Sequence, residues 1–185
     1  MVGFLMAFIA VILVGAGGRD QLLVAGLAAR QGQRPALLII GLVCAALAAL
    51  GAIWLASSFA PKLELPVRRM MAVLALGLAA LEMIVMRPKP GAAEPTESLG
   101  AFSAVLLAMQ ITDAARFLIF GIIMASALPG AAGLGGALGG MAVVFIGWAA
   151  GAKMHDLPLA KIRRALGIAL LVLAAGLVVF LRQSA

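Results

Sequence analysis

Charged side chains are scarce in this chain. Of its 185 residues, Asp, Glu, Lys and Arg together make up 11%, whereas 65% are hydrophobic. A soluble domain carries about 25% charged residues to cover its surface, so this shortage excludes a soluble globular protein. Six apolar spans of about 20 residues would use roughly 120 residues, which leaves no room for a separate domain outside the membrane.

Cysteine and histidine occur once each, as Cys44 and His155. A single cysteine excludes an intramolecular disulfide and a thiolate metal cluster. His155 has no second His or Cys at ligand spacing, and we interpret it as a loop residue. The chain also lacks a nucleophile–base pair and a cofactor motif. We therefore expect no enzymatic activity and no bound cofactor.

Apolar runs are what the chain does contain, and six of them are long enough to cross a lipid bilayer. They cover residues 2–29, 35–60, 67–86, 99–128, 131–152 and 160–181. The first run has no preceding basic segment, so we expect a retained span and not a signal peptide. The glycine-rich run 130–140 lacks the ending of a phosphate-binding loop and is expected to let helices approach closely.

The two halves of the chain align with an offset near 95 residues. Trp54 precedes the pair Arg68-Arg69 by 14 residues, and Trp148 precedes Arg163-Arg164 by 15. Three spans in each half reverse the orientation of the second half, and inverted repeats of this kind are typical of transporters. The predicted fold is therefore an all-α membrane protein of six transmembrane helices, with repeats at 1–88 and 99–185 joined by a polar cytoplasmic linker, 89–98.

The formal charge of +7 is explained by membrane topology, and we expect no nucleic-acid partner. Eight basic residues fall on one predicted side and four on the other, which places the first side in the cytoplasm and both termini outside. On the cytoplasmic side are Arg30, Arg34, Arg87, Lys89, Lys153, Lys161, Arg163 and Arg164; on the other are Lys62, Arg68, Arg69 and Arg182. Glu82 is interpreted as an interfacial residue beside Arg87, with a role in gating or proton relay as the alternative. A bacterial inner membrane is the expected location.

Ionisable residues interrupt two apolar runs near their middles. Arg19 and Asp20 do so in the first run, and Asp113 and Arg116 in the fourth. Such residues cost roughly 2.5–3.5 kcal/mol each at the bilayer centre, so they need partners or a water-filled cavity. We expect the two interruptions to meet near the midplane, with Arg19 pairing Asp113 and Asp20 pairing Arg116, beside a local pair of Asp113 with Arg116.

Polar and glycine neighbours surround these charges. Gly15, Gly17 and Gly18 precede Arg19 and are expected to break the first helix. Gln21, Gln110 and Thr112 offer further hydrogen-bonding groups. The predicted substrate and proton site therefore consists of Asp113, Gln110, Thr112, Arg19, Asp20 and Gln21, with Arg116 as a charge-pairing residue.

The stretch from Gly15 to Leu22, with Gln110 to Ala115 in the second half, resembles the motif of the six-helix Ca²⁺/Mn²⁺:H⁺ antiporters. That motif runs Glu-x-Gly-Asp-Lys/Arg-Ser/Thr, occurs once in each inverted repeat and is usually followed by Gln. Gly17, Arg19, Gln21 and Asp113 match it, while glycines stand at 15 and 18 and Gln110 replaces the second glutamate. The resemblance implies a divalent cation:proton antiporter with an altered cation site, Asp113 as its metal ligand, and Mn²⁺ or Ca²⁺ as cargo.

Charge arithmetic separates this chain from that family. The two family motifs together carry net −2, whereas Arg19, Asp20, Asp113 and Arg116 sum to zero. Hard divalent cations require several oxygen ligands that include carboxylates. The expected partners are the lipid bilayer, protons and a transported cation or small solute. Whether the chain forms a homo-oligomer is left open. Two alternatives also stay open: a non-transporting membrane scaffold, and an exporter of a small organic solute.

Overall fold

The structure is a computed structural model that describes residues 2–86, 98–126 and 128–183. Within these ranges the chain forms helices and no strands, which confirms the all-α fold class. The order is α1 (Val2–Gly15), α2 (Arg19–Gln31), α3 (Pro35–Phe59), η1 (Ala60–Lys62), α4 (Leu65–Val85), α5 (Leu99–Ile111), α6 (Ala114–Ala125), α7 (Pro129–Ala150), η2 (Gly151–Asp156) and α8 (Leu159–Gln183). Apart from Ser98, the predicted linker 89–98 lies outside the described residues.

Three helical segments are long and apolar enough to cross a membrane: Pro35–Lys62, Pro129–Met154 and Leu159–Gln183. Up to five spans result if each of two bent helix pairs, α1–α2 and α5–α6, crosses as one. These segments are consistent with a multi-pass membrane protein. Helix α4 is not among them because its 21 residues include Arg68, Arg69 and Glu82. The predicted count of six spans therefore stays a prediction.

The first apolar run bends by 64° between α1 and α2. Gly17 has a φ of +70°, in the left-handed region that glycine tolerates without steric cost. Gly18 is extended and starts α2. A side chain at Gly18 would also collide, because an added Cβ would lie 2.7 Å from Asp20 Oδ1 and 2.9 Å from the Gly15 carbonyl oxygen.

The fourth run bends by 48° between α5 and α6. Here no glycine is involved. Asp113 is extended at the start of α6, and its Oδ2 accepts a hydrogen bond of 3.2 Å from the Ala115 amide. An aspartate in this position satisfies an amide that would otherwise have no partner at a helix start. The carboxylate therefore fixes where α6 begins.

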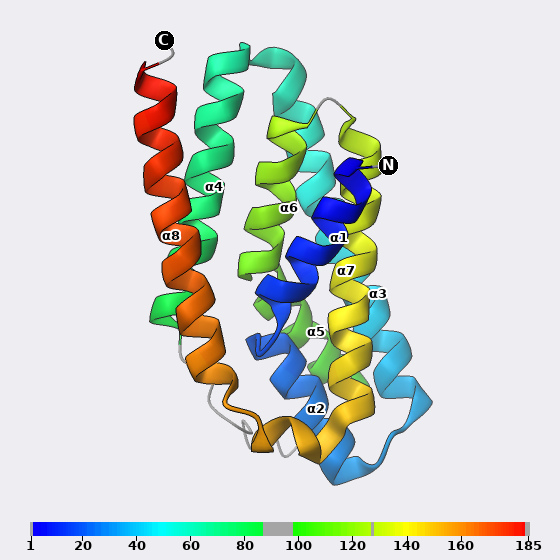
Figure 1. Cartoon of the computed structure of the whole chain (residues 1–185). Helices are drawn as coiled ribbons and strands as arrows, with labels where there is room; N and C mark the ends of the chain where they lie inside the picture. Colours follow the sequence, from blue (N-terminus) through cyan, green and yellow to red (C-terminus); the bar gives the residue numbers. More distant parts are fainter. Residues whose placement is uncertain (1, 87–97, 127, 184–185) are drawn as a thin grey trace.

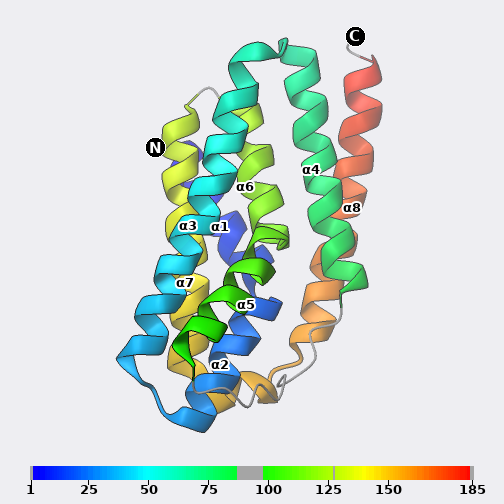
Figure 2. The same ribbon diagram turned by 180° about the vertical axis from the view of Figure 1, so that it is seen from behind.

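The bundle has two pairs of long helices on opposite sides. Helices α3 and α7 pack on one side and α4 and α8 on the other, with the two broken helices between them (Figures 1 and 2). The end of α6, the η1 connection and the end of α8 lie at the upper end in Figure 1, and the connection from α2 to α3 and η2 lie at the lower end.

The glycines of α7 let this helix approach α1 and α2 closely, as the sequence predicts. A Cβ added at Gly135 would overlap the Phe4 carbonyl oxygen of α1, and one at Gly139 would lie 2.8 Å from the Phe8 carbonyl oxygen. An added Cβ at Gly147 would lie 2.8 Å from the Gln21 carbonyl oxygen of α2. Small residues thus bring α7 into backbone contact with both halves of the first broken helix.

Candidate functional site

The two helix breaks meet inside the bundle through polar side chains. Arg19 Nη2 lies 3.3 Å from Thr112 Oγ1 and 3.5 Å from the Thr112 carbonyl oxygen. Gln110 Nε2 donates to Asp20 Oδ2 at 3.3 Å. Residues 90 and 93 positions apart in the sequence are therefore in contact, and each contact joins one break to the other.

Gln21 holds the first break together. Its Oε1 accepts a 2.7 Å hydrogen bond from the Gly17 amide, and its Nε2 donates to the Val143 carbonyl oxygen of α7 at 3.1 Å. Asp20 Oδ1 accepts from the Gln21 amide at 2.8 Å. Gln21 is 2% exposed and both of its amide atoms are occupied. Gln21 therefore holds the first break in place against α7, and its role toward cargo stays a prediction.

Two further charged residues belong to the site, and the sequence interpretation missed both. Arg163 of α8 forms an ion pair with Glu82 of α4 through Nη2, and the same Nη2 lies 3.6 Å from Asp113 Oδ1. Arg163 Nη1 donates to the Val14 carbonyl oxygen at the end of α1, at 3.0 Å. Glu82 Oε1 in turn lies 3.6 Å from Arg19 Nε.

The interpretation of Glu82 as an interfacial residue is wrong, because Glu82 is 8% exposed and paired within the bundle. Arg163 was predicted to lie at the cytoplasmic start of the last span, but it is 1% exposed and paired within the bundle, so it is not a charge of the membrane surface. Without it the predicted charge count falls from eight to seven against four. A signal was present in the sequence: Gly167 and Ala174 follow Arg163 at helical spacing and mark the face of α8 that packs inward.

Neither predicted pair between the two breaks forms in the described structure. Arg19 pairs with Glu82 and not with Asp113, and Asp113 pairs with Arg163. Arg116 is 4% exposed and has no ion-pair or hydrogen-bond partner for Nε and Nη2; it lies against Gly140 of α7. The predicted local pair of Asp113 with Arg116 is absent too, because Asp113 Oδ2 is directed at the Ala115 amide.

The site, which we call the break cluster, contains three carboxylates and three guanidinium groups, and its formal charge is zero. Its members are Asp20, Glu82, Asp113, Arg19, Arg116 and Arg163, together with Gln110 and Thr112. Most are buried, but the side chain of Arg19 is 23% exposed and Thr112 is exposed. The cluster can therefore be reached from outside the bundle at the contact between Arg19 and Thr112.

Several buried polar atoms of the cluster make no hydrogen bond to the protein, among them Gln110 Oε1 and Asp113 Oδ1. A buried polar atom without a partner costs about 1–3 kcal/mol, so these atoms favour a bound polar molecule. The donor set does not fit a divalent cation: no group of three His, Cys, Asp or Glu residues in the described ranges could hold a metal ion.

No protein-family model, no curated protein and no solved structure matches this chain.

Proposed function

We propose that this chain is an integral membrane transporter built from two inverted three-span repeats, with the break cluster as its substrate site. One observation carries the proposal: two broken helices from opposite halves of the chain meet polar group to polar group, Arg19 on Thr112 and Gln110 on Asp20. Paired discontinuous helices at a repeat interface are where transporters bind their substrates. An intramembrane ionisable residue is by default a functional one.

The packing of the helices supports the repeat. Helix α7 packs against α1 and α2, and its counterpart α3 packs against α5 and α6. The last helix of each half, α4 and α8, pairs with the other. A two-fold relation between the halves would produce both arrangements: the middle helix of each half packs on the broken helix of the other half, and the two last helices pack together. The seven-to-four excess of basic residues favours a cytoplasmic location for the end that carries η2.

The charge of the cluster favours a cargo that carries both signs. A divalent cation would bring an uncompensated charge of +2 into a buried site of net zero, and such a charge is expensive away from water. A small zwitterionic solute presents an anion to a guanidinium and a cation to a carboxylate without changing the total. We assign proton coupling to Asp113, which can accept a proton while its helix-capping role persists. A divalent cation, which is the cargo that the family resemblance implies, is less favoured.

Alternating access is tested most directly without knowing the cargo. In a Cys44→Ala background, Thr112→Cys is reconstituted into vesicles and treated with a membrane-impermeant maleimide from either side. We expect labelling from both sides, because a transporter exposes its site alternately. Lys62→Cys and Lys153→Cys, at opposite ends of the bundle, serve as controls that label from one side each. Labelling of Thr112→Cys from a single side contradicts the transporter proposal.

Asp113→Asn is expected to reduce solute-driven proton flux at least tenfold. Vesicles with trapped pyranine report proton movement when a mixture of the twenty amino acids is added outside. Asparagine can still cap α6, so the variant should fold normally but cannot carry a proton. Asp156→Asn, an exposed residue of η2, is the matched control and should retain the flux. Unchanged flux in Asp113→Asn would remove Asp113 from the mechanism, and no flux in the unmodified protein would contradict the cargo class.

Divalent metals are expected to leave the stability of the purified protein unchanged. Specific binding raises stability by RT ln(1 + [L]/Kd), about 2.7 kcal/mol at a hundredfold excess over Kd. We expect no shift in the melting temperature with millimolar Mn²⁺ or Ca²⁺ relative to Mg²⁺. A dose-dependent rise specific to Mn²⁺ or Ca²⁺ would restore the cation antiporter as the leading function.

A second candidate function is favoured by the equal numbers of acids and bases in the cluster. In a membrane scaffold the ion pairs would only fix helix packing, and replacing a buried pair by apolar residues is often neutral. The scaffold predicts that Thr112→Cys labels from one side and that vesicles show no solute-driven proton flux. The transporter predicts the opposite result in both measurements.

A further inference from the structure

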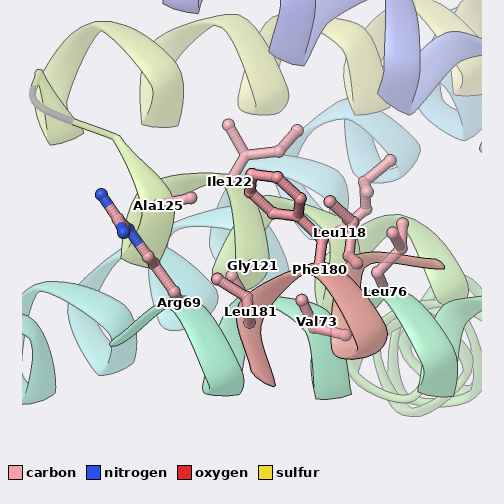
Figure 3. A pocket seen from close by; sticks show the side chains of 11 residues that line it. Arg69, Val73, Leu76, Leu118, Gly121, Ile122, Ala125, Phe180 and Leu181 are labelled. Atoms are coloured by element: carbon pink, nitrogen blue, oxygen red, sulfur yellow. The ribbon is translucent and has the colours of Figure 1, made fainter. Parts of the chain in front are cut away.

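A hollow of about 570 Å³ opens between α4, α6 and α8 (Figure 3). Its walls are apolar, and their main side chains are Leu76 of α4, Leu118 and Ile122 of α6, and Leu177 and Phe180 of α8. This volume falls within the range of about 300–1,000 Å³ of ligand pockets. No residue of the break cluster lines it, so it is separate from the proposed substrate site.

The hollow exists because α8 packs against α4 while α6 stays apart from α8. Helices α4 and α6 approach closely at Gly121, where an added Cβ would lie 3.1 Å from the Ala72 carbonyl oxygen. The small side chains at this crossing form the floor of the hollow. Only 11% of the apolar span in α8 is buried inside the bundle, so lipid can reach this helix from several sides.

A second apolar hollow, of about 520 Å³, lies between α1, α6 and α8. It shares Leu76, Leu118, Ile122 and Ala125 with the first. The two hollows therefore meet along α6. Two adjoining apolar hollows of similar size match the two acyl chains of a phospholipid.

Arg69 is the one charged residue that lines the first hollow, and it lies at one end of the labelled side chains (Figure 3). Its neighbour Arg68 is occupied, since Nε and Nη2 donate to the Met124 and Ser126 carbonyl oxygens at the end of α6. Arg69 is exposed and has no hydrogen bond or ion pair within the described chain. Its guanidinium is therefore available to an anion from the membrane.

The surroundings of Arg69 are basic and lie at the correct depth for a headgroup. Lys62 of η1, Arg68 of α4 and Arg182 of α8 lie at the same end of the bundle, and Glu64 is the one acid at that end among the described residues. From Arg69 to Leu76 the hollow follows α4 for about 10 Å, at 1.5 Å per residue. That length fits within the hydrocarbon half of one leaflet, roughly 15 Å thick.

We propose that this hollow is a binding site for an anionic two-chain phospholipid. The phosphate binds Arg69, one acyl chain lies between α4, α6 and α8, and the other lies between α1, α6 and α8. The lipid fills the space beside α8 and holds this helix, with Arg163, against the bundle. Arg69 is the basic residue that lines the hollow, and a basic side chain at the membrane surface strengthens attraction to anionic lipid by about 1 kcal/mol, which is about a fivefold change in affinity.

Native mass spectrometry and thermal unfolding of the detergent-purified chain test the proposal with phosphatidylglycerol and phosphatidylcholine. We expect phosphatidylglycerol to bind at least fivefold more tightly and to raise the melting temperature more. Arg69→Gln should weaken phosphatidylglycerol binding about fivefold, to the level of phosphatidylcholine. Lys62→Gln, the same charge change at the same end but outside the hollow, should leave the preference intact. Ala125→Phe, which fills the shared part of both hollows, should weaken both lipids.

Three results would overturn the proposal. The first is loss of the expected selectivity: the unmodified chain binds the two lipids equally, or Arg69→Gln keeps the preference as Lys62→Gln does. The second is stabilisation by sodium phosphate alone that Arg69→Gln removes, because the site would then take a free anion and not a lipid. The third is a dimer that Ala125→Phe dissociates, because a second copy of the chain would then cover the hollow. If Ala125→Phe does not fold, the comparison of Arg69→Gln with Lys62→Gln decides.

Discussion

Replacing Arg163 by methionine is expected to lower the free energy of unfolding by about 3–5 kcal/mol. The substitution removes the ion pair with Glu82, the contact with Asp113 and the hydrogen bond to the Val14 carbonyl oxygen. Loss of one partner of a buried pair is this costly because it leaves an uncompensated charge away from water. Denaturant or thermal unfolding in detergent measures the change.

The control for this experiment is the adjacent residue. Arg164 is exposed, so Arg164→Met should change stability by no more than about 0.5 kcal/mol. A double variant, Glu82→Leu with Arg163→Met, should be more stable than Arg163→Met alone, because no unpaired carboxylate remains at position 82. Equal effects of Arg163→Met and Arg164→Met would show that the break cluster does not hold α8 to the bundle.

Gly135→Ala should have the second large effect, a loss of roughly 3 kcal/mol, at the upper end of the range for overpacking. An added methyl group overlaps the Phe4 carbonyl oxygen of α1. Because the obstacle is backbone and not a flexible side chain, α1 and α7 must separate. That movement would also disturb the end of α1, where Arg163 binds the Val14 carbonyl oxygen.

Gly77→Ala is the matched control for this substitution. Gly77 lies in α4, and an added Cβ there meets nothing within 4 Å. Alanine has a higher helix propensity than glycine, so this variant should gain about 0.5–1 kcal/mol. The two glycine substitutions should therefore shift the melting temperature in opposite directions. A loss of stability in both would mean that packing against α1 is not what requires glycine at position 135.

Predictions from the sequence succeeded where a local property is sufficient. The ends of α3, α4, α7 and α8 lie within two residues of the predicted spans, because an apolar run bounded by proline and charged residues sets both limits of a helix. The glycines at 17 and 18 likewise mark a bend, since left-handed backbone is a local preference. The bend at Thr112 and Asp113 has no glycine, and it was not predicted from the sequence.

Pairing of the charges could not be predicted in the same way. Arg19 was predicted to pair with Asp113, and its observed partner, Glu82, was assigned to the membrane interface. Arg163 was counted among the cytoplasmic charges because it follows Pro158 and opens the last predicted span. Which charge faces which depends on the rotation and depth of four separate helices, and no local pattern contains that information.

The sequence alone determined that this is an all-helical chain with several segments long and apolar enough to span a membrane, because charge is scarce and the apolar runs are long. It also determined that charges near the middle of two runs require partners. The tertiary structure decided which residues are those partners, and it added Glu82 and Arg163 to the site. The physical reason is that helix formation depends on neighbours in sequence, whereas burial of a charge depends on groups that only packing brings within about 4 Å.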